Sequence, residues 1–283
     1  MQNIMRNIVS VDFLSELNPE NYRIIDCRFS LVDPEYGRQA YEQDHIPNAI
    51  YASLNKDLSS KVVKGITGRH PLPKPSEFEN TVREWGINNN QLVVLYDDDV
   101  GSYAARAWWM LRWLGHDQVV VLKGGYKAWK KSGKEISQQV PVFVPSLFKR
   151  ADPLTKQISA DALVNYQSDI VDARDPRRFS GEVEPIDPVA GHIPGARCMP
   201  FMLNVDDEGE FKSVADLRRQ FNEFGISDSQ ELVCYCGSGV TATHNILCLV
   251  QAGFPEPILY AGSWSEWITD PKREIVLGNA AGK

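Results

Sequence analysis

The chain has 283 residues, enough for two compact domains that each bury an apolar core of their own. Its 43% hydrophobic and 24% charged residues are typical of a folded globular protein and exclude a disordered or fibrous chain. The 37 acidic residues outnumber the 30 basic ones, and the net charge of -7 argues against nucleic acids and anionic membranes as partners. Small molecules or other proteins are the expected partners.

The amino-terminal stretch "MQNIMRNIVSVDF" lacks the basic start and the apolar core of a secretory signal, and no window reaches the length of a membrane span. The sequence therefore predicts a cytoplasmic protein. An odd number of cysteines in a chain of this size argues against a disulfide framework and favours reduced thiols. The five cysteines are Cys27, Cys198, Cys234, Cys236 and Cys248.

In chain order, apolar runs rich in Val and Ile predict strands at 23–27, 92–96 and 119–122, and again at 169–173 and 231–236. Helical stretches separate them, which favours parallel sheets joined by helices. Motifs recur in the same order in the two halves: "IIDCR" and "IVDAR", "DHIPNAI" and "GHIPGAR", "LKGGYKAW" and "YAGSWSEW". The chain is a duplication, and each half is predicted to be an α/β domain with an open parallel sheet and helices on both faces. His45 and His192 belong to the repeated "HIP" turn, so we interpret them as structural.

The predicted domains are residues 1–138 and 156–283, joined by a connector at 139–155 whose prolines disfavour both a helix and a central strand. The first half contains an additional Gly/Pro-rich segment, "SSKVVKGITGRHPLP", at 59–73. Such segments are more often inert surface loops than parts of a site. The histidine in it, His70, keeps a role in a site open.

Cys236 stands where ligands bind in open α/β sheets, at the carboxyl end of a strand and before a helix. The loop "GSG" after it permits a tight turn whose backbone N–H groups, together with the helix N-terminus, stabilise an anion. Such a position predicts a thiol pKa below the usual value of about 8.5 and favours a reactive thiolate. Cys234 and Cys248 lie inside an apolar strand and an apolar helix, and we interpret them as core residues.

Two other kinds of cysteine site fit less well. A zinc site is disfavoured because the spacing of Cys234 and Cys236 is wrong and no second Cys/His pair accompanies them. A cysteine phosphatase is disfavoured because it needs an arginine in the loop, whereas "GSGVTAT" carries no cation. No metal and no cofactor is predicted.

The motifs "D-[CA]-R … HIP-[NG]-A" and "CGSGVTA … GSW-x-EW" resemble those of the tandem-domain rhodanese superfamily of sulfurtransferases over nearly the whole chain. The loop "CGSGVTA" is similar to that of the 3-mercaptopyruvate sulfurtransferase branch, whereas thiosulfate sulfurtransferases typically carry two cations where this chain has Gly237 and Ser238. The resemblance implies that only the second domain is catalytic. In the first domain Asp97 occupies the position of the cysteine, in an acidic loop that would repel an anionic donor.

The resemblance implies an enzyme that moves a sulfane sulfur from 3-mercaptopyruvate to a Cys236 persulfide and then to a thiol, cyanide or thioredoxin-like acceptor. Two alternatives remain open: a thiosulfate:cyanide sulfurtransferase, and a non-catalytic binding or regulatory protein that keeps the scaffold. The thiol at 236 favours the enzyme, because a purely structural descendant has no reason to keep it there.

The resemblance also implies the residues that bind the donor. Arg178 is similar to the family's anion-binding arginine, with Arg177 as its nearest neighbour, whereas Ile186 stands where the mercaptopyruvate branch commonly has a second arginine. Ser238 and His70 are expected to act on the donor carbonyl. An acidic partner for them is expected near residues 55 to 57. The best-aligned position is Asn55, with Asp57 two residues further on, which argues against a complete Ser–His–Asp relay. The remaining members of the loop are Gly237, Gly239, Val240 and Thr241, and Thr241 is predicted to cap the following helix.

Overall fold

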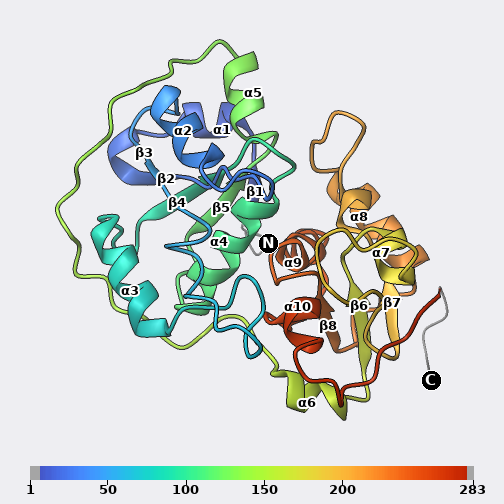
Figure 1. Ribbon diagram of the computed structural model, residues 1–283. Coiled ribbons are helices and arrows are strands. Elements are labelled where there is room, and N and C mark those ends of the chain that lie inside the picture. Colours follow the sequence, from blue (N-terminus) through green and yellow to red (C-terminus); the bar gives the residue numbers. More distant parts are fainter. Residues whose placement is uncertain (1–6, 279–283) are drawn as a thin grey trace. The chain divides into compact units, whose positions relative to one another are not determined.

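The computed structural model describes residues 7–278, which divide into two units (Figure 1). The first unit comprises residues up to 60, 73–154 and 207–211, and the second comprises 61–72, 155–206 and the chain from 212 on. The domain limits 1–138 and 156–283 stay a prediction, and the packing departs from them at two points. Residues 61–72 pack with the second unit although they precede it in sequence, and residues 207–211 pack with the first.

The first unit is built on a five-stranded parallel sheet of order β1-β5-β4-β2-β3. Its strands are β1 (Ile8–Val9), β2 (Tyr22–Asp26), β3 (Ala49–Tyr51), β4 (Leu92–Tyr96) and β5 (Val119–Leu122). Its helices are α1 (Val11–Ser15), η1 (Pro19–Asn21), α2 (Tyr36–Gln43), α3 (Pro75–Glu84), α4 (Ser102–Trp113) and α5 (Gly125–Lys131). Nearly every residue of β4 and β5 is buried, as the continuous Val/Leu runs of a parallel sheet covered by helices require.

The second unit repeats this plan with a four-stranded parallel sheet of order β7-β6-β8-β9. Its strands are β6 (Asp169–Asp172), β7 (Ala196–Cys198), β8 (Leu232–Tyr235) and β9 (Ile258–Leu259). Its helices are α6 (Ala160–Val164), α7 (Pro176–Ser180), η2 (Phe201–Asn204), α8 (Val214–Glu223), α9 (Thr241–Gln251) and α10 (Ser263–Trp267). The predicted α/β fold with two duplicated parallel sheets is confirmed.

The repeated "D-x-R" motif forms the same buried ion pair in each unit. Asp26 and Arg28 pair at 2.7 Å after β2, and Asp172 and Arg174 pair at 2.6 Å after β6. Each guanidinium also donates to a backbone carbonyl next to the "HIP" turn, at Asp44 or at Gly191. The ion pair therefore links the end of β2 to the turn before β3 in the first unit, and the end of β6 to the turn before β7 in the second.

The two histidines of the "HIP" turns are buried and stack on aromatic rings of their own units. The ring of His45 lies 4.0 Å from that of Tyr41, and the ring of His192 lies 3.7 Å from that of Phe179. His192 Nδ1 is also 2.8 Å from the carbonyl oxygen of Phe179. In the second unit this packing fixes α7, the helix that carries Arg178.

Cys234 and Cys248 are fully buried, in β8 and α9, as expected of core residues. Burial raises the pKa of both thiols. No disulfide forms among the cysteines, all of which lie within residues 7–278. Their chemistry is therefore that of free thiols.

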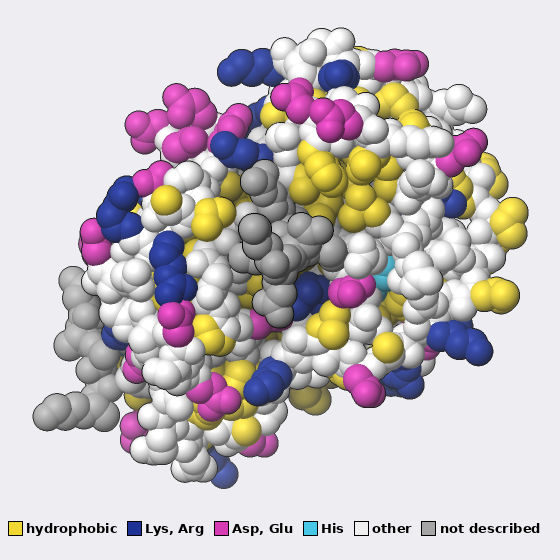
Figure 2. Space-filling view, turned by 180° about the vertical axis from the view of Figure 1, so that it is seen from behind, with side chains coloured by type: hydrophobic (Ala, Val, Ile, Leu, Met, Phe, Trp, Pro, Cys, Tyr) yellow, Lys and Arg dark blue, Asp and Glu magenta, His cyan; other side chains and the backbone are white. Residues whose placement is uncertain are grey.

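Within the described part of the chain, no helix combines the length and the apolar character needed to cross a bilayer. On the face drawn in Figure 2, acidic and basic side chains are interspersed outside the grey residues. This distribution agrees with the modest negative charge of the sequence.

Candidate active site

Cys236 follows the last residue of β8 and precedes α9, and its side chain lies among the loop amides. Its Sγ accepts a hydrogen bond from the backbone N–H of Gly239 at 3.2 Å. Gly239 has a φ of 75°, and a Cβ atom there would lie 2.2 Å from the carbonyl oxygen of Ala261. Only glycine allows the loop to turn back on the cysteine in this way.

The loop around Cys236 is fixed by backbone contacts with the segment that leads into α10 (Ser263–Trp267). Trp264 N–H donates to the carbonyl of Cys236 at 2.9 Å, and Ser265 N–H donates to that of Gly237 at 3.0 Å. In return, the N–H of Cys236 donates to Ser263 Oγ at 3.1 Å. The "GSWSEW" motif thus holds the loop of Cys236 from one side.

The first unit shows what the same loop does when it holds a side-chain carboxyl group, whose pKa burial raises to about 7. Asp97, at the end of β4, takes the position that Cys236 has after β8. Its carboxylate accepts hydrogen bonds from the backbone N–H groups of Asp99, Gly101, Tyr103 and Ala104 at 3.0 to 3.1 Å. The loop is therefore a cradle of N–H donors for a negatively charged group.

In the second unit the corresponding donors are open. The N–H groups of Ser238 and Val240 match those of Asp99 and Gly101, and neither has a hydrogen-bond acceptor among the described residues. Val240 is the N-cap of α9, with no side chain capping the helix, and Thr241 is its first helical residue. The prediction that Thr241 caps the helix is wrong, because its backbone is already helical. The uncapped N-terminus leaves donors for an anion.

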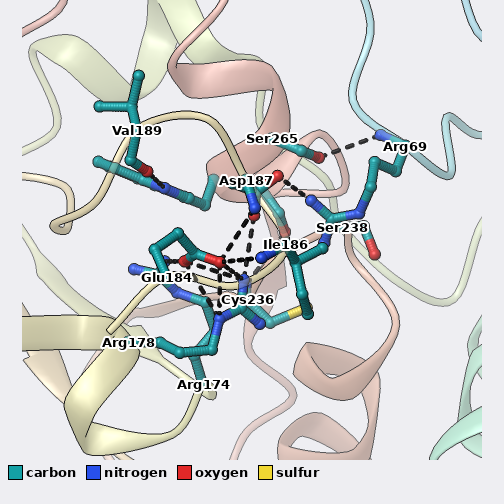
Figure 3. Close-up of polar contacts among 12 residues, drawn as sticks. Arg69, Arg174, Arg178, Glu184, Ile186, Asp187, Val189, Cys236, Ser238 and Ser265 are labelled. Atoms are coloured by element: carbon teal, nitrogen blue, oxygen red, sulfur yellow. Dashed lines mark hydrogen bonds and ion pairs between the residues drawn. The ribbon is translucent and has the colours of Figure 1, made fainter. Parts of the chain in front are cut away.

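Arg178 lies beside this loop and is held by two carboxylates (Figure 3). Its guanidinium donates to both oxygens of Glu184 at 2.8 to 3.1 Å and to Asp187 Oδ2 at 3.1 Å. Burial raises the pKa of Asp187 against the opposing effect of the arginines. Burial also acts to raise the pKa of Glu184, but Arg178 and the N–H groups of residues 186 and 187 lower it overall. Arg177, by contrast, pairs with Glu182 at the surface, and its side chain is 62% exposed.

Residues 61–72 bring two further side chains to the loop. His70 Nδ1 lies 2.8 Å from Ser238 Oγ, so the two residues predicted to act together are in contact. Asp57 lies in the first unit, where its carboxylate accepts the N–H of Ser53 at 2.7 Å. Of the two interpretations left open for this segment, an inert surface loop and a part of the site, the contact of His70 with Ser238 and the packing of residues 61–72 with the second unit favour the second.

Arg69 is the residue that the sequence analysis missed. It pairs with Asp187, and a Cβ atom at Gly237 would lie 2.8 Å from its Nη2 and 3.5 Å from Arg178 Nη1. The only sequence signal was its place before His70 in "GRHPLP". The loop itself carries no cation, but two guanidinium groups reach the residue after Cys236 from other segments.

No group of three or more His, Cys, Asp or Glu side chains in residues 7–278 is arranged to hold a metal ion. The chemistry available at the site is that of a thiol in an N–H cradle, flanked by two arginines and a Ser–His pair. Such a site can attack an electrophilic sulfur, hold the anion that forms and bind a donor that carries negative charge.

Comparisons with known proteins agree with this arrangement. The family model "Rhodanese-like domain" matches residues 10–132 and 152–270. A probable 3-mercaptopyruvate sulfurtransferase of Pseudomonas aeruginosa is 47% identical over 94% of this chain and 95% of its own. A putative thiosulfate sulfurtransferase, SseB, of Mycobacterium tuberculosis is 38% identical over 91% of each chain. The solved 3-mercaptopyruvate sulfurtransferase of Leishmania major superposes with a TM-score of 0.83 at 34% identity, covering 93% of this chain and 74% of that one.

The chain therefore belongs to the rhodanese family and carries one rhodanese-like domain in each half. It is a two-domain sulfurtransferase, an enzyme that moves sulfur from a donor to an acceptor.

Proposed function

We propose that this enzyme takes sulfur from 3-mercaptopyruvate, holds it as a persulfide on Cys236, and passes it to a thiol or cyanide. The observation that carries the choice of donor is the contact between Ser238 and His70 beside Cys236. A donor with a ketone next to its sulfur-bearing carbon needs a group that stabilises and protonates an enolate. Thiosulfate contains no ketone and forms no enolate, so its sulfur can be transferred without such a group.

In the first step the Cys236 thiolate attacks the donor sulfur. A bond forms between the two sulfur atoms, and the carbon–sulfur bond of the donor breaks, so that its electron pair stays on the carbon as the enolate of pyruvate. The Ser238 hydroxyl donates a proton to this enolate, and His70 replaces it. The persulfide remains in the cradle, where the free N–H groups of Ser238 and Val240 face it as Asp99 and Gly101 face the carboxylate of Asp97.

In the second step an acceptor thiolate or cyanide attacks the outer sulfur of the persulfide. The sulfur–sulfur bond breaks, the Cys236 thiolate leaves, and the free enzyme is restored. The acceptors that fit are cyanide, a small thiol or a reduced thioredoxin-like protein. Free cysteines support the cytoplasm as the compartment, since it keeps thiols reduced.

The residues proposed to bind the donor are Arg178 for its carboxylate and Ser238 with His70 for its carbonyl. The backbone of the loop surrounds the sulfur, and its members are Gly237, Gly239, Val240 and Thr241. No cofactor or metal is part of the proposal.

Thiosulfate is the second candidate, and the structure supplies a reason for it. The sequence analysis disfavoured this dianion because the loop lacks cations, yet Arg69 and Arg178 both reach Gly237. Two carboxylates, Glu184 and Asp187, offset this positive charge, which favours a donor with a single charge.

Mass spectrometry of the purified enzyme after exposure to each donor tests the proposal. We expect Cys236 to gain one sulfur atom from 3-mercaptopyruvate, and the Cys236→Ser variant to gain none. We also expect kcat/KM for 3-mercaptopyruvate to exceed that for thiosulfate by at least about tenfold. Equal or reversed selectivity would replace the proposal with the thiosulfate enzyme, and no adduct with either donor would refute both.

A further inference from the structure

We infer that Arg69 is a second carboxylate-binding arginine of the donor site and supplies the cation that is absent at Ile186. The inference rests on the proposed function, since it concerns how a donor with a carboxylate is held. It adds the residue that directly precedes His70 and that lies far in the sequence from Arg178 and the loop of Cys236.

The first support is the convergence of two guanidinium groups on one point. A Cβ atom built on Gly237 would lie 2.8 Å from Arg69 Nη2 and 3.5 and 3.6 Å from Arg178 Nη1 and Nη2. Both guanidinium groups therefore pack closely against the residue that follows Cys236, and the absence of a side chain at Gly237 allows this approach. Two planar guanidinium groups that lie this close to one residue can hold one carboxylate between them.

The second support is the unused hydrogen-bonding capacity of Arg69. Its Nη1 pairs with Asp187, but its Nε is buried and has no hydrogen-bond partner among the described residues. Arg178 differs, because its Nε and Nη2 are already bound by Glu184. A buried guanidinium N–H without a partner is costly, and an anionic ligand would satisfy it.

The third support is that the backbone holds Arg69 rigidly in place. Its N–H donates to Ser265 Oγ at 3.1 Å, and a Cβ at the preceding Gly68 would lie 2.6 Å from the carbonyl oxygen of Gly262. Residues 68 and 69 therefore pack directly on the segment that also fixes the loop of Cys236. The position of Arg69 is therefore fixed by close backbone contacts of its own segment.

Position 186 is occupied by an apolar residue, and only its backbone contacts a carboxylate of the ion pairs. The N–H of Ile186 donates to Glu184 Oε1 at 3.0 Å, while its side chain is 39% exposed. It lies beside Asp187 in Figure 3 and contributes no charge. The guanidinium of Arg69 pairs with Asp187, the residue that follows Ile186 in the chain, and comes from residues 61–72.

Steady-state kinetics with two donors test the inference. The donors are 3-mercaptopyruvate and 1-mercapto-2-propanone, which has the same thiol and ketone but no carboxylate. We expect Arg69→Gln to raise KM for 3-mercaptopyruvate about ten- to a hundredfold with little change in kcat. KM for 1-mercapto-2-propanone should stay within about twofold of the wild-type value, because that donor makes no such contact.

Two further variants separate binding from structure. Ile186→Arg in the Arg69→Gln background should lower KM for 3-mercaptopyruvate again, because it returns a guanidinium to the site. Arg177→Gln is the matched control, since Arg177 lies at the surface outside the site, and it should leave both donors unaffected.

An equal loss with both donors in Arg69→Gln, or no loss with either, would overturn the inference while the proposed function stands. Failure of the wild-type enzyme to form a persulfide with 3-mercaptopyruvate would instead refute the proposed function. The mass spectra of the wild-type enzyme distinguish these results before any variant is assayed.

Discussion

Replacing Asp187 with asparagine should shift the enzyme toward donors with two negative charges. The carboxylate of Asp187 is 3% exposed, contacts Arg69, and accepts from Arg178 Nη2 at 3.1 Å. Among residues 7–278, it is the one carboxylate that pairs with both arginines. Asn keeps the shape of the side chain and removes its charge, so the surroundings of Gly237 become more positive by one unit.

The size of the shift follows from the charge of the donors. Thiosulfate carries one negative charge more than 3-mercaptopyruvate, and two unit charges about 6 Å apart interact by about 2.8 kcal/mol at an effective dielectric constant of about 20. The side chains of Arg69 and Arg178 are 26% and 16% exposed, so water and salt screen part of this energy. Half of it, about 1.4 kcal/mol, corresponds to a tenfold gain of thiosulfate over 3-mercaptopyruvate in kcat/KM.

The assay compares kcat/KM for both donors in the wild type and in Asp187→Asn across a range of pH, with the melting temperature as a control for folding. Burial raises the pKa of Asp187, so acidification neutralises it earlier than an ordinary aspartate. The ratio of thiosulfate to 3-mercaptopyruvate activity should therefore rise as pH falls in the wild type and stay flat in the variant. A ratio that the substitution leaves unchanged would refute the electrostatic account of donor choice.

Two more predictions concern the loop and its thiol. Gly239→Ala should lower the melting temperature and reduce kcat at least about tenfold, because the new Cβ would lie 2.2 Å from the carbonyl oxygen of Ala261. Gly133→Ala is its control, since Gly133 also has a positive φ but no atom within 4 Å of the Cβ position, and a similar loss of kcat there would contradict the reasoning. Iodoacetamide at pH 8 should label Cys236 before the other cysteines: burial raises the pKa of Cys198 to about 12 and that of Cys27, Cys234 and Cys248 as well. Peptide mapping checks the order, and equally fast labelling of Cys198 would speak against a reactive thiol at 236.

The architecture and the place of Cys236 at a strand end could be predicted because their signals are local. Runs such as "LVVLY" and "ELVCYC" are long and apolar enough to mark central strands, and the repeat of "D-x-R" and "HIP" gives their order. The strands β1, β3, β7 and β9 were not predicted, since each has only two or three residues and adds little periodicity. Their formation depends on a longer neighbouring strand that is already in place.

Arg69 could not be predicted because its role depends on contacts between distant parts of the chain. The residue is 196 positions from Ser265, whose hydroxyl accepts its N–H. In the sequence it lies in a Gly/Pro-rich segment of the first half, where a surface charge is the usual interpretation. Only the packing of residues 61–72 with the second unit places this arginine beside Asp187 and Gly237.

The comparison of Asp97 with Cys236 shows how the two halves of the duplicated chain differ at the same strand end. The sequence suggested that the acidic loop of the first half repels an anionic donor. The structure gives a more specific reason, since the carboxylate of Asp97 fills the cradle and uses four backbone N–H groups that a bound anion would need. The cysteine side chain is shorter and accepts one such bond, from Gly239, which leaves Ser238 and Val240 with open N–H groups. A difference of one side chain at the same strand end thus separates a closed loop from one that can hold a transferred sulfur.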